Sequence, residues 1–326
     1  MTSSTPLRPG RRATAPPTVP APPGTPFSWA SGHRDELRAA LAEHGAVLVR
    51  GLDLRDAGQV GAVAGGLGGV PAAEREAFAA RTVHREGVYS SAAWPPQQPM
   101  CMHHELSYLQ DCPGLLLIAC LTAADAGGET GTADGSAVLA ALPEDLVRRF
   151  ETEGWLLTRT YGADIGATVE QSFGTGDPAA VDAYCRAHGI TAEWGPDGSL
   201  RTRQRRAAVI RHPADGRRCW FNQIAFLSRW TLDPEVREYL TDVHGPDALP
   251  FDTRYGGGDP VDEETVRLLN EVYAEHTAPH SWRAGDLLIL DNLRTAHSRE
   301  PYQGSRDMVV AMADPVRPSA LAPTPR

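Results

Sequence analysis

The chain has 326 residues, 41% of them hydrophobic, and a formal net charge of −10. This length is enough for one large domain or two small ones, and the acidic balance argues against a general nucleic-acid or membrane-surface binder. No lysine occurs among the 31 basic residues, which excludes Schiff-base catalysis by lysine and phosphate binding by a Walker-type loop.

The two ends of the chain differ in composition from the rest. Residues 1–26 are rich in Pro, Ala, Thr and Arg and contain no apolar run of signal-peptide length, so we expect a disordered tail. Residues 316–326 are again rich in proline and are expected to be loose. Residues 27–315 would then form a single domain.

Cysteine usage and hydropathy indicate a cytoplasmic protein. The five cysteines are odd in number and form no CxxC pair, which suits free thiols in a reducing compartment. No stretch approaches the roughly 20 apolar residues that a membrane helix needs.

Between the tails, short strands and turns alternate with a few helices. Apolar spacing predicts helices over Asp35–His44, Pro143–Phe150 and Glu263–His276. Apolar runs predict strands over Ala46–Val49, Leu115–Leu121, Asp286–Leu290 and Met308–Ala313, and strands Arg206–Arg211 and Arg218–Phe221 around a Pro213–Gly216 turn. This pattern favours a β-sandwich core with added helices over a βαβ repeat. The basic run Arg201–Arg206 is interpreted as a solvated hairpin or loop face.

A candidate metal site comes from two distant segments. His103 and Glu105 are two residues apart, so in a strand they would point to the same face, with His104 on the other. His297 follows the predicted strand Asp286–Leu290 and could complete a 2-His-1-carboxylate set, which holds Fe(II) by one face and leaves the other open. A surface His–Glu pair is the ordinary alternative, and His104 would become a ligand if the strand ended early.

A basic residue near this site predicts an acidic co-substrate. Arg306 lies nine residues after His297, and a strand turning back beside His297 could place its guanidinium in the same cavity. A buried arginine needs a carboxylate partner. 2-Oxoglutarate could chelate iron through its keto acid and offer its far carboxylate to Arg306, with a hydroxyl from Thr130. The alternative is a structural salt bridge to Glu300 or Asp307.

Taken in order, several blocks resemble one enzyme family, the TauD/TfdA-type Fe(II)- and 2-oxoglutarate-dependent dioxygenases, and most closely its SyrP-like group of syringomycin biosynthesis. The blocks are Val88–Ser91, Met102–Tyr108, Gly127–Thr130, Ala133–Asp134, Trp220–Gln223, Gly285–Asp286, Asp291–Asn292, His297, Arg299–Tyr302 and Arg306. The resemblance implies a mixed α/β fold with a double-stranded β-helix (jelly-roll, cupin-like) core flanked by helices. It also implies Fe(II), with 2-oxoglutarate and O2 as co-substrates. By the same resemblance, His103, Glu105 and His297 match the catalytic iron ligands, and Arg306 and Thr130 match the 2-oxoglutarate contacts.

The resemblance also implies a reaction. It is hydroxylation of an aliphatic C–H of an amino acid, free or tethered to a carrier protein, in natural-product biosynthesis, with 2-oxoglutarate converted to succinate and CO2. Candidate substrate contacts are Asn222, Arg299 and Tyr89. For Asn222 and Tyr89 the alternative is ordinary packing and hydrogen bonding, and for Arg299 it is an ion pair with Glu300. The retained Glu105 speaks against a halogenase. Desaturation or cyclisation at the same iron, a 2-oxoglutarate-independent cupin-like metalloenzyme, and a non-catalytic binding protein stay as alternatives.

Overall fold

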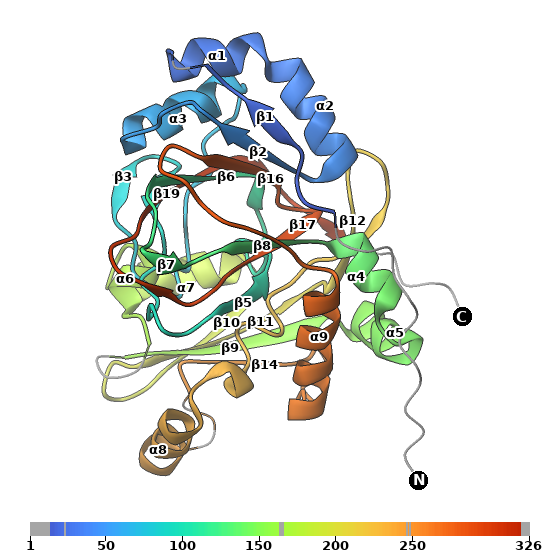
Figure 1. The fold of residues 1–326 in the computed structure, drawn as a ribbon. Helices are drawn as coiled ribbons and strands as arrows, with labels where there is room; N and C mark the ends of the chain where they lie inside the picture. The colour runs from blue at the N-terminus through green and yellow to red at the C-terminus, as the bar shows by residue number, and fades with distance from the viewer. Residues whose placement is uncertain (1–13, 23, 163–165, 246, 248, 321–326) are drawn as a thin grey trace.

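Two β-sheets face each other at the centre of the molecule (Figure 1). The structure, a computed structural model, describes residues 14–22, 24–162, 166–245, 247 and 249–320. The larger sheet has the strand order β1 (Thr18–Pro20), β2 (Ala46–Arg50), β16 (Leu287–Asp291), β6 (Cys112–Thr122), β19 (Asp307–Val316), β4 (Val88–Ser90) and β3 (Val83–Arg85). The smaller sheet has the order β15 (Ala278–His280), β8 (Thr130–Asp134), β17 (Thr295–Arg299) and β5 (Met100–His103). This is the predicted jelly-roll core.

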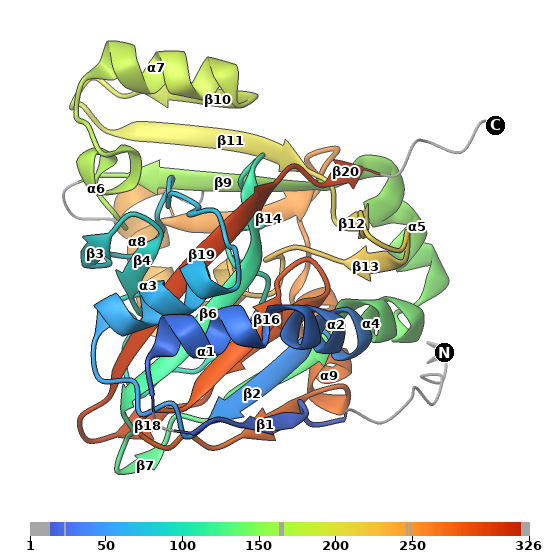
Figure 2. The same cartoon turned by 90° about the horizontal axis from the view of Figure 1, so that it is seen from above.

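The larger sheet is buried on both faces. Helices α1 (Pro26–Gly32), α2 (Arg34–His44) and α3 (Ala57–Gly66) cover its outer face (Figure 2). In β6, Leu115 and Leu117 belong to the hydrophobic cluster under these helices, whereas Leu116 and Ile118 belong to the cluster between the two sheets. Since alternate side chains of a strand point to opposite faces, an uninterrupted apolar run is what this position requires.

The remaining elements surround this core. A second four-stranded sheet has the order β10 (Ile190–Trp194), β11 (Leu200–Arg206), β9 (Trp155–Tyr161) and β14 (Phe251–Tyr255). Shorter strands are β13 (Arg218–Trp220), β12 (Val209–Arg211) and β20 (Ser319–Ala320), and β7 (Ala126–Gly127) with β18 (Tyr302–Gln303). The other helices are α4 (Gly135–Ala141), α5 (Glu144–Glu153), α6 (Val169–Phe173), α7 (Pro178–Ala187), α8 (Pro234–His244) and α9 (Glu263–Glu275), with a short 3-10 turn at Arg229–Thr231.

Most of the predicted elements are present, including a hairpin at the basic run. The three predicted helices correspond to α2, α5 and α9, and β12 pairs with β13 around the predicted turn. Residues 201–206 belong to strand β11, which pairs antiparallel with β10, so the hairpin alternative is the correct one and the loop is not. Thr202 and Gln204 are buried there, and Arg201, Arg203 and Arg205 alternate with them on the other face, so alternation within a strand explains the pattern.

The prediction of disordered tails is wrong for the segments that join sheets. Thr18–Pro20 forms β1, which pairs in parallel with β2, and Pro26 begins α1. Ser319–Ala320 forms β20 and pairs with β12. Proline lacks an N–H and is therefore accepted at a sheet edge, which a reading of composition alone does not anticipate. Residues 1–13 and 321–326 of the two predicted tails lie outside the described residues.

All five cysteines are free, as predicted. No helix in the described part of the chain is long and apolar enough to cross a membrane.

Candidate active site

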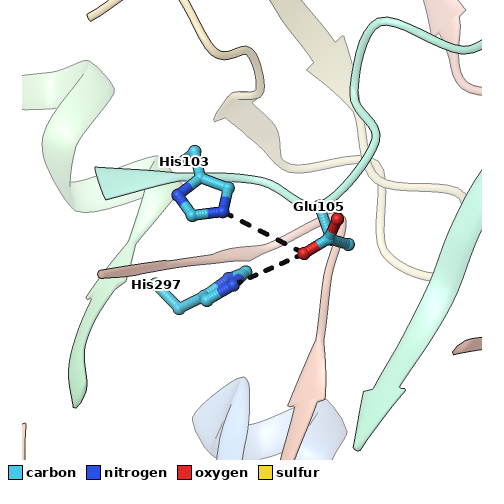
Figure 3. Close-up of side chains that lie close together, drawn as sticks. All are labelled: His103, Glu105 and His297. Carbon is cyan, nitrogen blue, oxygen red and sulfur yellow. Dashed lines mark ion pairs between the residues drawn. The ribbon is translucent and has the colours of Figure 1, made fainter. Parts of the chain in front are cut away.

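Two histidines and a glutamate converge at one end of β5 and in the middle of β17 (Figure 3). His103 is the last residue of β5, and His297 lies opposite it in the paired strand β17. The Glu105 Oε2 atom lies 4.0 Å from His103 Nε2 and 3.7 Å from His297 Nε2. One ligand atom from each residue lies within 4.8 Å of the others, and all three residues are buried. Two imidazoles and a carboxylate at this spacing can hold one metal ion.

The backbone reaches this arrangement differently from the prediction. The strand ends at His103, so Glu105 lies in a turn, followed by Leu106 with a φ of 51°. The side chain of Asn292 accepts a hydrogen bond from the Glu105 N–H at 2.8 Å and donates to the Glu105 carbonyl at 2.9 Å. These two bonds replace those that a neighbouring strand would supply, and they fix the turn that carries the carboxylate.

His104 points away from the other two histidines, although the strand does end early. Its Nδ1 donates to the carbonyl of Asn292 at 2.6 Å, and its ring lies 4.9 Å from that of Phe221. Burial lowers the pKa of His104 to about 4, so the ring is neutral at ordinary pH. The alternative of His104 as a ligand receives no support from this geometry, because the residue is not part of the cluster.

Both candidate ligand histidines favour the neutral form, which can donate an electron pair to a metal ion. The Nδ1 of His103 hydrogen-bonds the Cys101 carbonyl at 2.8 Å, which places the proton on Nδ1 and leaves Nε2 free toward Glu105. Burial lowers the pKa of His103, and burial followed by the proximity of His103 lowers the pKa of His297 well below its usual range. Neutral imidazoles with a carboxylate fit the facial ligand set of a non-haem Fe(II) centre.

An arginine that sequence reasoning missed holds the carboxylate. Arg81 lies in the segment before β3, and its Nη2 donates to Glu105 Oε1 at 2.9 Å. Its Nε forms an ion pair with Glu74 Oε1 at 3.0 Å. Burial, followed by the charge of Glu105, raises the pKa of Glu74 to about 7, opposed by Arg81. No motif surrounds Arg81 in the sequence, so no local signal could have found it.

Arg306 and Thr130 line the same small cavity as the three candidate ligands, with a volume of about 70 Å³. The expected strand beside His297 is wrong: Arg306 directly precedes β19 of the larger sheet, whereas Thr130 begins β8 of the smaller sheet. They therefore approach from opposite walls. Thr130 Oγ1 accepts a hydrogen bond from Trp282 Nε1 at 3.0 Å, which leaves the hydroxyl hydrogen free to donate.

The charge of Arg306 has no carboxylate partner within the described residues, and neither predicted salt bridge, to Glu300 or Asp307, is formed there. Its guanidinium lies 5.3 Å from the centre of the Tyr302 ring. Burial, followed by the nearby charge of Arg299, lowers the pKa of Arg306 to about 10, so it stays cationic. A partly buried cation of this kind fits an anionic ligand.

The three candidate substrate contacts differ in position. Arg299 lines the cavity, and its Nη2 donates to the Pro95 carbonyl at 2.8 Å and to the Gln98 carbonyl. Asn222 and Tyr89 do not line it. The Asn222 amide donates to one backbone carbonyl and accepts from the N–H of Ile224, and the Tyr89 hydroxyl accepts from the N–H of Glu74. These two side chains are occupied by backbone groups, which is the packing alternative.

The amino-acid sequence is similar to those of one protein family and of two described proteins. Residues 4–312 match the model of the family described as "Taurine catabolism dioxygenase TauD, TfdA family". The dapdiamide synthesis protein DdaC of Enterobacter agglomerans is 33% identical over 280 residues, 86% of this chain and 85% of that protein. A clavaminate synthase-like protein of Arabidopsis thaliana is 26% identical over 290 residues, 85% of this chain and 83% of that protein.

Solved structures support the fold. A putative alpha-ketoglutarate-dependent taurine dioxygenase from Burkholderia xenovorans is 16% identical with a TM-score of 0.53, covering 96% of this chain and 91% of that chain. AAD-2 in complex with Mn(II) and N-oxalylglycine is 17% identical with a TM-score of 0.53, covering 96% and 99%. The chain therefore belongs to the TauD, TfdA family and is an Fe(II)- and 2-oxoglutarate-dependent dioxygenase that uses O2.

Proposed function

We propose that this dioxygenase hydroxylates an aliphatic C–H of an amino acid, free or tethered to a carrier protein, in natural-product biosynthesis in the cytoplasm. The observation that carries the proposal is the convergence of His103, Glu105 and His297 in a cavity that Arg306 also lines. The relationship to a dapdiamide synthesis protein, at 33% identity over most of both chains, supports the biosynthetic setting. The retained carboxylate of Glu105 supports hydroxylation over halogenation.

Each site residue has a role in this proposal. His103, Glu105 and His297 hold Fe(II) by one face, and the other face stays available to co-substrates. Iron and 2-oxoglutarate together supply the oxidising chemistry, with release of succinate and CO2. Arg306 pairs with the far carboxylate of 2-oxoglutarate, and the Thr130 hydroxyl, oriented by Trp282, donates to that same carboxylate. The buried walls keep bulk water from the reacting centre.

Among the candidate substrate contacts, Arg299 is the one that reaches the cavity. Its Nε has no hydrogen-bond partner among the described residues, and its charge suits the carboxylate of an amino acid. We assign no substrate contact to Asn222 or Tyr89.

The first experiment adds Fe(II) and then 2-oxoglutarate without oxygen and records the weak visible metal-to-ligand charge-transfer band. We expect the band in wild type, its loss in Glu105→Ala, and a weaker band in Arg306→Ala at equal 2-oxoglutarate. Arg317→Ala is the matched control, because Arg317 is an exposed arginine whose partner, Asp111, lies on the surface. Equal 2-oxoglutarate affinity in Arg306→Ala and this control would contradict the role of Arg306.

Succinate release then screens amino acids, free and carrier-bound. A product that gains one oxygen atom supports hydroxylation, whereas a product that loses two hydrogens indicates desaturation or cyclisation. An enzyme that shows the band but gives no substrate-dependent succinate with any amino acid would refute the proposed substrate class.

A further inference from the structure

Arg81 lies between two buried carboxylates beside the candidate metal site. Its Nη2 is 2.9 Å from Glu105 Oε1 and its Nε is 3.0 Å from Glu74 Oε1. The side chains of Arg81, Glu74 and Glu105 are 4%, 10% and 3% exposed, so this row of charges is closed off from solvent. We propose that Arg81 is a positioning residue that makes Glu105 a one-oxygen metal ligand. The inference rests on the proposed Fe(II) site.

The two oxygens of Glu105 face different partners. Oε1 accepts the hydrogen bond from Arg81, whereas Oε2 is the atom that lies 4.0 Å and 3.7 Å from the Nε2 atoms of His103 and His297. A glutamate has one more rotatable bond than an aspartate and can turn either or both oxygens toward a metal. Binding of Oε1 by the guanidinium selects Oε2 as the ligand atom and fixes the plane of the carboxylate.

Single-oxygen binding matters for the reaction. An octahedral ion with three protein ligands has three open positions. 2-Oxoglutarate would take two of them if it chelates through its keto acid, and O2 would need the third. A second bond from Glu105 would occupy one of these positions, so holding Oε1 away keeps the site competent for both co-substrates.

The segment before β3, which carries Arg81, is held in place by hydrogen bonds from β9 and α7. Arg159 of β9 donates to the carbonyls of Glu76 and Ala77, and Tyr184 of α7 donates to Glu76 Oε1 at 2.9 Å. Glu76 has a φ of 54°, an unusual conformation for a residue other than glycine. Such anchoring by buried side chains places Arg81 at a fixed distance from the site.

The carboxylate of Glu74 explains how the positively charged Arg81 can lie beside a site that binds the positively charged Fe(II). An isolated guanidinium next to Fe(II) would repel the metal, but the carboxylate of Glu74, in its ionised form, offsets the charge of Arg81. The effect of Arg81 on metal binding is therefore mainly one of orientation. Removing both members together, at a pH above 7 where Glu74 is mostly ionised, tests that orientation with little change in the local charge.

The test compares wild type with the double variant Glu74→Gln/Arg81→Met, with Arg81→Lys, and with Glu74→Gln, which keeps the contact to Glu105. Anaerobic titrations measure Fe(II) affinity, 2-oxoglutarate affinity and the position of the charge-transfer band. We expect the double variant to bind Fe(II) about 10- to 100-fold more weakly, the usual effect of losing a partner of a metal ligand. We also expect its band to shift and its 2-oxoglutarate affinity to fall, with partial recovery in Arg81→Lys. Glu74→Gln should keep the band position of wild type.

A folded double variant with Fe(II) and 2-oxoglutarate affinities within about twofold of wild type and an unshifted band would overturn the proposal. If the double variant does not fold, Arg81→Lys decides the question, because a wild-type band and wild-type affinities in it would equally overturn the role of Arg81. Failure of wild type itself to bind Fe(II) would instead contradict the proposed metal site.

Discussion

Replacing Asn292 with alanine should weaken stability and iron binding together. The Asn292 side chain is fully buried and lies between the ligand turn and the start of β6. Its Nδ2 donates to the carbonyls of Glu105 at 2.9 Å and Pro113 at 2.7 Å, and its Oδ1 accepts from the Glu105 N–H at 2.8 Å. Alanine removes all three hydrogen bonds and leaves three backbone groups without these partners.

The magnitude follows from these contacts. Each net hydrogen bond contributes about 1 kcal/mol, and each buried group left unpaired costs about 1–3 kcal/mol, so the free energy of unfolding should fall by about 3–6 kcal/mol. Because Asn292 holds both backbone groups of Glu105, the carboxylate should also lose its fixed position. We expect Fe(II) affinity to fall about tenfold or more.

Urea denaturation of the metal-free protein and anaerobic Fe(II) titration measure the two effects. Asn270→Ala is the matched control: Asn270 lies half-buried on α9, and its side chain makes no hydrogen bond within the described ranges. If Asn292→Ala unfolds at the same urea concentration as this control and keeps its iron affinity, the turn is not held by Asn292 and the reasoning fails.

Three further predictions concern neighbouring residues. Since burial lowers the pKa of His104 to about 4 from 6.5, its neutral form stabilises the fold above pH 6.5, and on the order of 3 kcal/mol is lost as the pH falls toward 4. His104→Gln should therefore lose less stability than wild type between about pH 7.5 and about pH 5, and an equal loss in urea denaturation would contradict this. Trp282→Phe removes the donor to Thr130 and should raise the Kd for 2-oxoglutarate about fivefold at unchanged Fe(II) affinity, as the charge-transfer titration would show. Arg159→Leu loses two hydrogen bonds to backbone carbonyls, so we expect the free energy of unfolding, measured by urea denaturation, to fall by about 2 kcal/mol. We also expect weaker Fe(II) binding. An unchanged Fe(II) affinity would show that the segment before β3 keeps its position without Arg159.

Local patterns predicted a β-sandwich core with added helices because the sequences of the core strands reflect their burial, whereas the jelly roll itself came from the family resemblance. The run Leu115–Leu121 is apolar at every position, and β6 is covered on both faces. The alternation within Arg201–Arg206 reflects one buried face and one exposed face of a hairpin strand, which composition alone did not distinguish from a loop.

The candidate site was predicted in its residues but not in its geometry. His103, Glu105 and His297 do converge, yet Glu105 lies in a turn that depends on Asn292, 187 residues away in the sequence. A single sequence does not reveal such a contact, because nothing near Glu105 marks where the strand ends. The role of Arg81 could not be predicted for the same reason, because its partners become its neighbours only when the chain folds.

The two walls of the sandwich contribute unequally to what they enclose. The candidate metal ligands belong to the smaller sheet and the turn after β5, whereas the candidate contacts for the far carboxylate, Thr130 and Arg306, come one from each sheet. The two sheets already pack through the apolar cluster between them, and on the proposed assignment bound 2-oxoglutarate would add a polar connection at the cavity. Each turnover would break that connection, because succinate lacks the keto acid through which 2-oxoglutarate would chelate the metal. The polar contact between the two sheets at the cavity would therefore form and break once in every catalytic cycle.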